Sequence, residues 1–223
     1  MFQFFERLTK PFPDEAPTQP PKGLVAFCRY YSQGMWGIIA IVSLLSAVIA
    51  ALEVTLFGFL GQLVDWFSQH DRETFLQDEF WTLMGMGFVV VVMIPGCILL
   101  RSLFNRQSLM GNYPMRIRWQ AHRYLLGQSL SFFHNEFAGR VATKVMQTAL
   151  SVRETVMKLL DLMVYICVYF ISMVVLIFST DWRLAVPLLI WFVVYLCILR
   201  VLVPKLKAVS QAQADARAVM TGR

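Results

Sequence analysis

Four long apolar runs divide the chain. The first two lie at about 35–64 and 80–100, and the other two at about 159–178 and 184–203. A helix needs about 20 predominantly apolar residues to cross the hydrocarbon of a bilayer, and each run is long enough. The pattern therefore predicts an all-α membrane protein with four transmembrane helices. An even number of crossings places both termini on the same side.

The segment between the second and third runs is amphipathic and predicts a helical hairpin over 101–158. In its first half apolar residues recur at spacings of three and four, at Met110, Tyr113, Ile117, Ala121 and Tyr124. A similar stripe follows FFHNEFAG, at Val141, Val145, Ala149, Val152, Val156, Leu159 and Met163. We expect the two helices to pack antiparallel outside the membrane. A helix over 80–130 would be about 75 Å long, whereas the hydrocarbon is about 30 Å thick, so some 40 Å should project.

The N-terminal region divides at about residue 21. Residues 1–21 contain five prolines and lack the apolar core of a signal peptide, which predicts a flexible leader. Residues 22–34 place Leu24, Phe27 and Tyr31 on one helical face but are too short and too charged to span. They predict an interfacial elbow helix, although they could instead form the end of the first crossing.

Composition excludes an ordinary soluble domain and charge orients the predicted helices. The chain is 57% hydrophobic with 15% charged residues, compared with about 25% charged in soluble proteins. Its net charge is +6, and Lys and Arg concentrate before the first run, between the second and third, and after the fourth. The other two connections contain only Arg72 and Arg183. Because cytoplasmic loops are enriched in Lys and Arg, we expect both termini and the hairpin to be cytoplasmic. Orientation and anionic lipid headgroups explain this charge without a nucleic-acid partner.

The sequence indicates no catalytic or metal centre. It contains no H-E-x-x-H, C-x-x-C or G-x-S-x-G motif, and His70, His122 and His134 are scattered. The four cysteines show no paired spacing, which favours small apolar packing residues over disulfides or metal ligands. They are Cys28, Cys97, Cys167 and Cys197.

Glu53 is the one acidic residue near the middle of a predicted span. A carboxyl group there is costly unless it faces protein or water. It either lines a cavity that favours cationic or hydrogen-bonding cargo, or forms a structural bond to another span. Tyr165, Tyr169 and Ser172 share one side of the third span and could line the same cavity or simply pack. Asp161, one turn away, is expected near the membrane boundary, where it could be solvated.

Several motifs, in this order, resemble the transmembrane domain of exporter-type ABC transporters. The resemblance begins at about residue 22 and rests on FGFLGQLVDWF, FFHNEFAGRVATKVMQTALSVRE, STDWRLAVPLLI and LVPKLKAVSQAQADARAVMTGR. In that family an FF-x-x-x-x-x-G-x segment forms a short coupling helix, expected here at about 133–140. The resemblance implies contact with a nucleotide-binding domain through Phe132, Phe133, His134, Asn135, Glu136, Phe137 and Gly139.

Family members have six spans and an ATP-binding domain with a G-x-x-x-x-G-K-[ST] loop. This sequence has four spans and no such loop, which predicts a partial transmembrane domain that cannot hydrolyse ATP alone. ATP and Mg²⁺ are then expected in a nucleotide-binding domain, and a second transporter half as a partner. The resemblance implies part of the substrate pathway of an ATP-driven exporter in a bacterial inner membrane. The alternative is a membrane scaffold, without transport activity, whose hairpin recruits a soluble partner.

Overall fold

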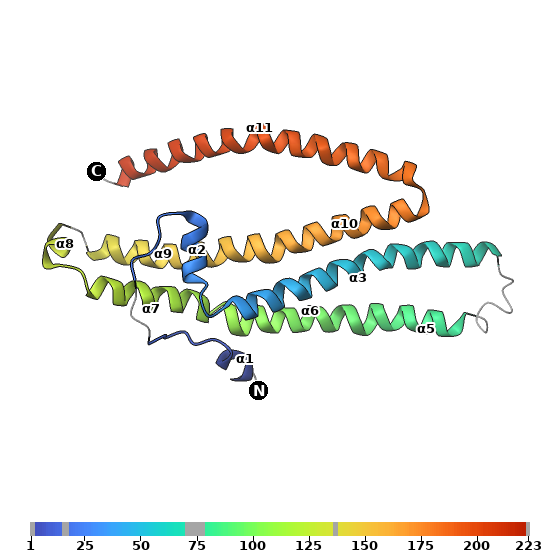
Figure 1. Ribbon diagram of the computed structural model, residues 1–223, viewed down its shortest axis with the longest axis horizontal. Helices are drawn as coiled ribbons and strands as arrows, with labels where there is room; N and C mark the ends of the chain where they lie inside the picture. The colour runs from blue at the N-terminus through green and yellow to red at the C-terminus, as the bar shows by residue number, and fades with distance from the viewer. Residues whose placement is uncertain (1–2, 15–17, 70–78, 136–137, 222–223) are drawn as a thin grey trace. The chain divides into compact units, whose positions relative to one another are not determined.

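The computed structural model describes residues 3–14, 18–69, 79–135 and 138–221, and every regular element in them is a helix (Figure 1). The chain forms two compact units, Met1–Ser172 and Met173–Arg223. Four helices are long and apolar enough to cross a membrane, and they contain the four predicted spans. They are Trp36–Phe67, Phe80–Leu126, Gly139–Thr180 and Trp182–Gln213. The prediction of an all-α membrane protein with four membrane helices is confirmed.

The second membrane helix of the first unit changes its hydrogen-bonding pattern along its length. It comprises, in order, α5 (Phe80–Phe88), η1 (Val89–Met93), α6 (Ile94–Leu103), η2 (Phe104–Leu109) and α7 (Asn112–Leu126), where η denotes a π-helix. Pro95 is the second residue of α6, two positions after the end of η1. Because proline lacks an N–H and its ring clashes with the preceding turn, the wider π turn accommodates it within a continuous helix.

The third membrane helix has one such interruption. It comprises α9 (Ala138–Met157), η3 (Lys158–Leu162) and α10 (Met163–Thr180). At about 1.5 Å per residue, the second and third membrane helices measure roughly 70 and 60 Å, about twice the thickness of the hydrocarbon. Each therefore extends well beyond any bilayer that it crosses.

The core of the first unit forms where α2 (Leu24–Tyr31), the start of α3 (Trp36–Gln69), η2, α7 and α9 meet. Helices α7 and α9 run antiparallel side by side, as the two amphipathic stripes predict (Figure 1). The fully or nearly fully buried residues of this core are Tyr31, Met35, Ile38, Ile39, Val42, Leu109, Tyr113, Ile117, Ala149, Val152 and Val156.

Three positions of the predicted stripes are wrong, and the helix geometry explains why. Leu159 is 56% exposed and Met163 is 44% exposed. After Val156 the next buried residue is Asp161. That step of five residues coincides with η3, whose hydrogen bonds join residues five apart. Met110 is exposed for a similar reason, since the helix is interrupted between η2 and α7 and Leu109 is buried in its place.

The described part of the leader lies along η2 and α7, whereas the sequence predicts a flexible segment. Helix α1 (Gln3–Arg7) packs on η2, where the ring of Phe5 meets that of Phe104 edge to face. Thr9 is buried and donates a hydrogen bond to the carbonyl of Ser108 at 3.2 Å.

Beyond Thr9 the leader is bound through its backbone carbonyls. Arg116 donates to the carbonyl of Lys10 at 3.0 Å, and the indole of Trp119 donates to that of Pro13 at 3.1 Å. Arg123 donates to the carbonyl of Asp14 at 2.9 Å. Proline restricts the unbound chain, so less conformational entropy is lost when the segment becomes ordered. The prolines that suggested flexibility thus favour a bound, extended segment.

The elbow helix α2 is separate from the first membrane helix. It is followed by a turn in which Gly34 has φ +78°, and α3 begins two residues later. Glycine suits this turn because side chains disfavour positive φ. A Cβ at this position would also lie 3.0 Å from the guanidinium of Arg116. Residues 22–34 are therefore not simply the end of the first crossing.

The second unit contains the end of α10 and the helix α11 (Trp182–Thr221). Only Asp181 separates the two helices, and its carboxylate accepts a hydrogen bond from the backbone N–H of Arg183 at 2.9 Å. This contact satisfies one of the free donors at the start of α11. Pro187 and Pro204 lie inside α11. Among the free cysteines, Cys28 and Cys97 are half-buried, whereas Cys167 and Cys197 are exposed and do not pack as the sequence predicts.

Candidate functional site: polar contacts between the membrane helices

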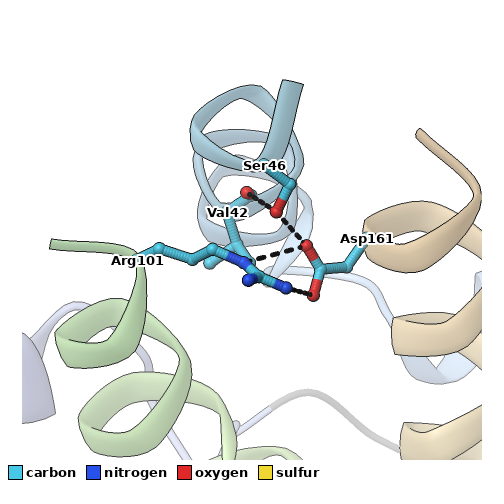
Figure 2. Close-up of polar contacts among 4 residues, drawn as sticks. All are labelled: Val42, Ser46, Arg101 and Asp161. Atoms are coloured by element: carbon cyan, nitrogen blue, oxygen red, sulfur yellow. Dashed lines mark hydrogen bonds and ion pairs between the residues drawn. The ribbon is translucent and has the colours of Figure 1, made fainter. Parts of the chain in front are cut away.

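Three helices bring Ser46, Arg101 and Asp161 together (Figure 2). Asp161 belongs to η3 and is only 8% exposed. One of its oxygens, Oδ2, accepts a hydrogen bond from Nη2 of Arg101 on α6 at 2.6 Å, and Oδ1 accepts one from Nε at 3.3 Å. This bidentate arrangement matches the planar guanidinium to the carboxylate.

Ser46 of α3 completes the cluster. Its hydroxyl contacts Oδ1 of Asp161 and lies 3.0 Å from the carbonyl of Val42 (Figure 2). A serine hydroxyl carries one proton, so these two acceptors compete for it. Ser46 is fully buried, and the cluster thus fixes a carboxylate, a guanidinium and a hydroxyl within one polar contact.

The cluster corrects the interpretation of Asp161 as a solvated boundary residue. Its carboxylate is buried because Arg101 and Ser46 replace the lost water. A buried charge is tolerated when an opposite charge and hydrogen bonds compensate for its desolvation. Arg101 follows the second predicted span, and Asp161 lies just inside the third. The pair therefore ties α6 to η3 close to the predicted edge of the hydrocarbon.

A second polar contact lies further along the same helices. The hydroxyl of Tyr165 on α10 donates a hydrogen bond to Oε2 of Glu53 on α3 at 2.5 Å. The rings of Tyr165 and Tyr169 stack with their centroids 6.0 Å apart. Glu53 follows Ser46 by two helical turns, and Tyr165 follows Asp161 by about one. Two polar contacts therefore join α3 to the third membrane helix along one seam.

Three of the four residues predicted to line a cavity lie in the seam. Glu53, Tyr165 and Tyr169 come together in it, while Ser172, two turns beyond Tyr165, is half-buried. Within the described part of the chain Ser172 joins neither polar contact. Sequence reasoning missed Ser46 and Arg101. Two signals could have indicated them. Arg101 and Asp161 carry opposite charges at the end of the second predicted span and the start of the third, and Ser46 and Glu53 are seven residues apart.

The turn between the two long helices holds the predicted coupling residues. A short helix, α8 (Leu130–Asn135), occupies it, earlier than the expected 133–140. Phe132 is half-buried and meets the ring of Phe133 edge to face at 5.3 Å, and Phe133 is 45% exposed. His134 is exposed, and Gly139 lies in the first turn of α9. Asn135 ends α8, whereas Glu136 and Phe137 lie outside the described residues.

Phe133 adjoins a groove of about 390 Å³ between α7 and α9. Most of its other lining residues are apolar, and they come from the facing sides of both helices. They are Arg118, His122, Leu125, Leu126, Val141, Ala142, Val145 and Met146. Leu126 is 69% exposed and Met146 is 49% exposed. The tip of the hairpin therefore presents an accessible apolar surface.

Comparison with known proteins agrees with this architecture. The family model for the ABC transporter transmembrane region matches residues 36–223. An uncharacterized ABC transporter ATP-binding protein of Haemophilus influenzae is 43% identical to this chain over all 223 residues. These residues cover 36% of that relative's length. No solved structure matches. The family match includes all four membrane helices and both polar contacts of the seam, and the chain belongs to the ABC transporter transmembrane region family.

Proposed function

We propose that this chain forms part of the substrate pathway of an ATP-driven exporter and transmits the state of an ATP-binding domain through its hairpin tip. The main observation that supports the proposal is the exposed aromatic and apolar surface around Phe133. Some 25 residues of helix separate the tip from Arg101, which corresponds to about 40 Å. At that distance from the hydrocarbon, an apolar surface is better suited to a protein than to lipid.

The proposed orientation places the hairpin tip and both termini in the cytoplasm of a bacterial cell. The distribution of Lys and Arg supports it, since cytoplasmic connections are enriched in these residues. The relative from Haemophilus influenzae supports a bacterial inner membrane. The tip would then face the compartment that supplies ATP.

The proposed partner is a nucleotide-binding domain of the ABC type. The relative is named as an ATP-binding protein, whereas this sequence contains no G-x-x-x-x-G-K-[ST] loop. We therefore assign ATP and Mg²⁺ to the partner domain and to no residue of this chain. A second transporter half would complete the pathway. ATP binding can drive transport only if it favours one of two packings of the membrane helices, and the hairpin would carry that preference.

Replacing Phe133 with alanine tests the coupling role. In the complete transporter, Phe133→Ala is expected to lower transport about tenfold, because a buried aromatic contact often contributes more than 1 kcal/mol to an interface. ATP hydrolysis should continue, since the substitution lies outside the ATP site. Transport into membrane vesicles and phosphate release, measured on the same preparation, provide both values.

Phe178→Ala is the matched control, because Phe178 is an aromatic residue that is 61% exposed, near the C-terminal end of α10 and far along the chain from the hairpin tip. It should leave both rates close to those of the unchanged protein. Normal transport by Phe133→Ala would contradict the proposed role of the tip. The scaffold would be favoured instead by two results together. The unchanged protein would show no ATP-dependent transport of any cargo, and Phe133→Ala would release a soluble protein that the unchanged protein binds.

Glu53→Gln tests whether the seam contributes to cargo selection. Glutamine keeps an oxygen that can accept the hydrogen bond from Tyr165 but removes the negative charge. We expect export of cationic relative to neutral cargo to fall about tenfold, as for the loss of between about 1 and 2 kcal/mol of charge attraction. Transport of a panel of cargo compounds measures this ratio.

Tyr165→Phe is the complementary variant, because it removes the hydrogen bond and keeps the charge. It should preserve the cargo ratio. An unaltered cargo ratio in Glu53→Gln, together with a lower yield of folded protein, would assign Glu53 a purely structural role.

A further inference from the structure

A basic groove separates η2 from the junction of α9 and η3. Its volume is about 380 Å³, and three of its lining residues are the cations Arg106, Arg153 and Lys158. Glu154 is the one acidic residue in the lining. The groove is distinct from the seam, which uses other faces of the same helices, and from the groove at the hairpin tip.

The cations of this groove are largely uncompensated. Within the part of the chain that the structure describes, the side chains of Arg106 and Lys158 form no hydrogen bond or ion pair. Arg153 donates to the carbonyl of Met110 at 3.3 Å, which orients its guanidinium. Its ion pair with Glu154 is long, at 3.8 Å, and the side chain of Glu154 is 55% exposed. The groove therefore retains a net positive charge.

The depth of the groove matches the headgroup layer of a bilayer. Arg106 lies six residues beyond residue 100, where the second predicted span ends, which corresponds to about 9 Å. Lys158 immediately precedes the third predicted span, and Arg153 precedes it by about 9 Å. The headgroup layer extends roughly 5 to 8 Å from each face of the hydrocarbon, and long basic side chains reach toward it.

The remaining lining residues suit an amphiphile. Met110 and Met157 add apolar surface beside the cations, and Asn105 adds an amide that can donate and accept hydrogen bonds. Guanidinium groups bind phosphate through paired hydrogen bonds, and an ammonium group adds a compact charge. A phosphate next to a glycerol or acyl segment would contact both kinds of lining.

We propose that this groove binds an anionic phospholipid, with the lipid phosphate held by Arg106, Arg153 and Lys158. The site depends on the chain's membrane placement but not on its proposed role in ATP-driven export. Lipid binding and coupling can therefore fail independently.

The test compares two triple variants with equal losses of charge. R106Q/R153Q/K158Q alters the groove, while R200Q/K205Q/K207Q removes three exposed cations from α11. Each purified protein is titrated with phosphatidylglycerol or phosphatidylcholine in detergent, and bound lipid is measured by native mass spectrometry. We expect the groove variant to lose affinity for phosphatidylglycerol by about a hundredfold, since each basic residue contributes about 1 kcal/mol. The α11 variant should retain most of that affinity.

Equal losses in the two variants would overturn the proposal, because they would show a diffuse charge effect. Equal affinity of the unchanged protein for phosphatidylcholine would also overturn it. Displacement of the lipid by inorganic phosphate at millimolar concentration would assign the groove to a soluble anion instead. If helix content measured by circular dichroism shows that the triple variant is unfolded, K158Q alone replaces it, with an expected loss of about fivefold.

Discussion

Asp161→Ala is expected to destabilise the protein by about 3 kcal/mol, because it leaves Arg101 without its buried partner. The carboxylate accepts two hydrogen bonds from Arg101 and contacts the hydroxyl of Ser46. Its loss leaves the guanidinium without a partner, and the cost is limited because the Arg101 side chain is one-third exposed. Unfolding of the purified protein in mixtures of SDS and mild detergent, followed by circular dichroism, measures the change.

A double-mutant cycle separates the pair from its surroundings. Arg101→Ala should also destabilise, and the double variant should cost less than the sum of the single changes, since it leaves no unpaired charge. Glu154→Gln is the control, because its carboxylate is exposed and forms only a long ion pair of 3.8 Å with Arg153, and it should change stability by less than about 1 kcal/mol. If Asp161→Ala were as mild as Glu154→Gln, the carboxylate would be hydrated rather than buried.

Tyr113→Ala is expected to cost between about 3 and 5 kcal/mol, as for other truncations of fully buried aromatic residues. Tyr113 is 0% exposed in the core shared by α2, α3, α7 and α9. Its hydroxyl lies 2.5 Å from Oγ of Ser32, which itself donates to the carbonyl of Cys28 at 2.6 Å. Either hydroxyl can donate in the contact between Tyr113 and Ser32. Detergent unfolding measures this effect as well.

Tyr113→Phe separates the packing of the ring from its hydrogen bond. It should cost only about 1 kcal/mol, the usual net contribution of one hydrogen bond. Leu126→Ala, at a 69% exposed position on the same helix, should change stability by about 0.5 kcal/mol or less. A cost for Tyr113→Phe equal to that of Tyr113→Ala would show that the hydroxyl, rather than the ring, dominates.

The pH dependence of stability gives an independent measurement of Tyr113. Burial raises the pKa of Tyr113 to about 12, whereas an unfolded tyrosine ionises near about 10. Its contribution to stability is therefore complete below about pH 10 and is lost as the pH rises toward 12. Tyr113→Phe should lose less stability than the unchanged protein over this interval. Identical pH profiles would contradict the burial of an ionisable hydroxyl.

The membrane helices could be predicted because their signal is summed over about 20 residues. A few polar residues, such as Glu53 and Gln62 in the first span, do not cancel it. The pairing of α7 with α9 was also visible, because Tyr113, Ile117, Ala149 and Val152 repeat with the period of an α-helix. These predictions depend on local sequence patterns, which remain recognisable when the helix geometry changes slightly.

The exact register could not be predicted, because it depends on hydrogen-bond geometry within single turns. α-Helical spacing predicts that the stripe through Val156 continues to Leu159 and Met163, but η3 shifts the buried position to Asp161. The ordering of the leader could not be predicted for a related reason. Its hydrogen bonds with Arg116 and Trp119 use backbone carbonyls, which every residue carries and no sequence pattern reveals.

The seam was only partly predictable. Glu53 is recognisable from the sequence because an acidic residue in an apolar run is costly wherever it lies. Its bond to Tyr165 depends on how two helices are rotated toward each other, as does the contact between Ser46 and Asp161. In the sequence, Arg101 indicates only orientation, because it lies at the edge of a span. Its pairing requires three helices to be placed in space, and that information lies outside any local pattern.

The π turn η3 has a mechanical consequence for the helix that contains it. A π turn contains one residue more than an α-helical turn. Each residue of an α-helix rotates the chain by about 100° about the helix axis. Exchanging the hydrogen bonds of η3 for α-helical ones would therefore twist α9 about its own axis relative to α10. The face of α9 that carries Ala149 and Val152 would then turn away from the direction set by Asp161. A movement passed between α9 and α10 can thus include torsion about the helix axis.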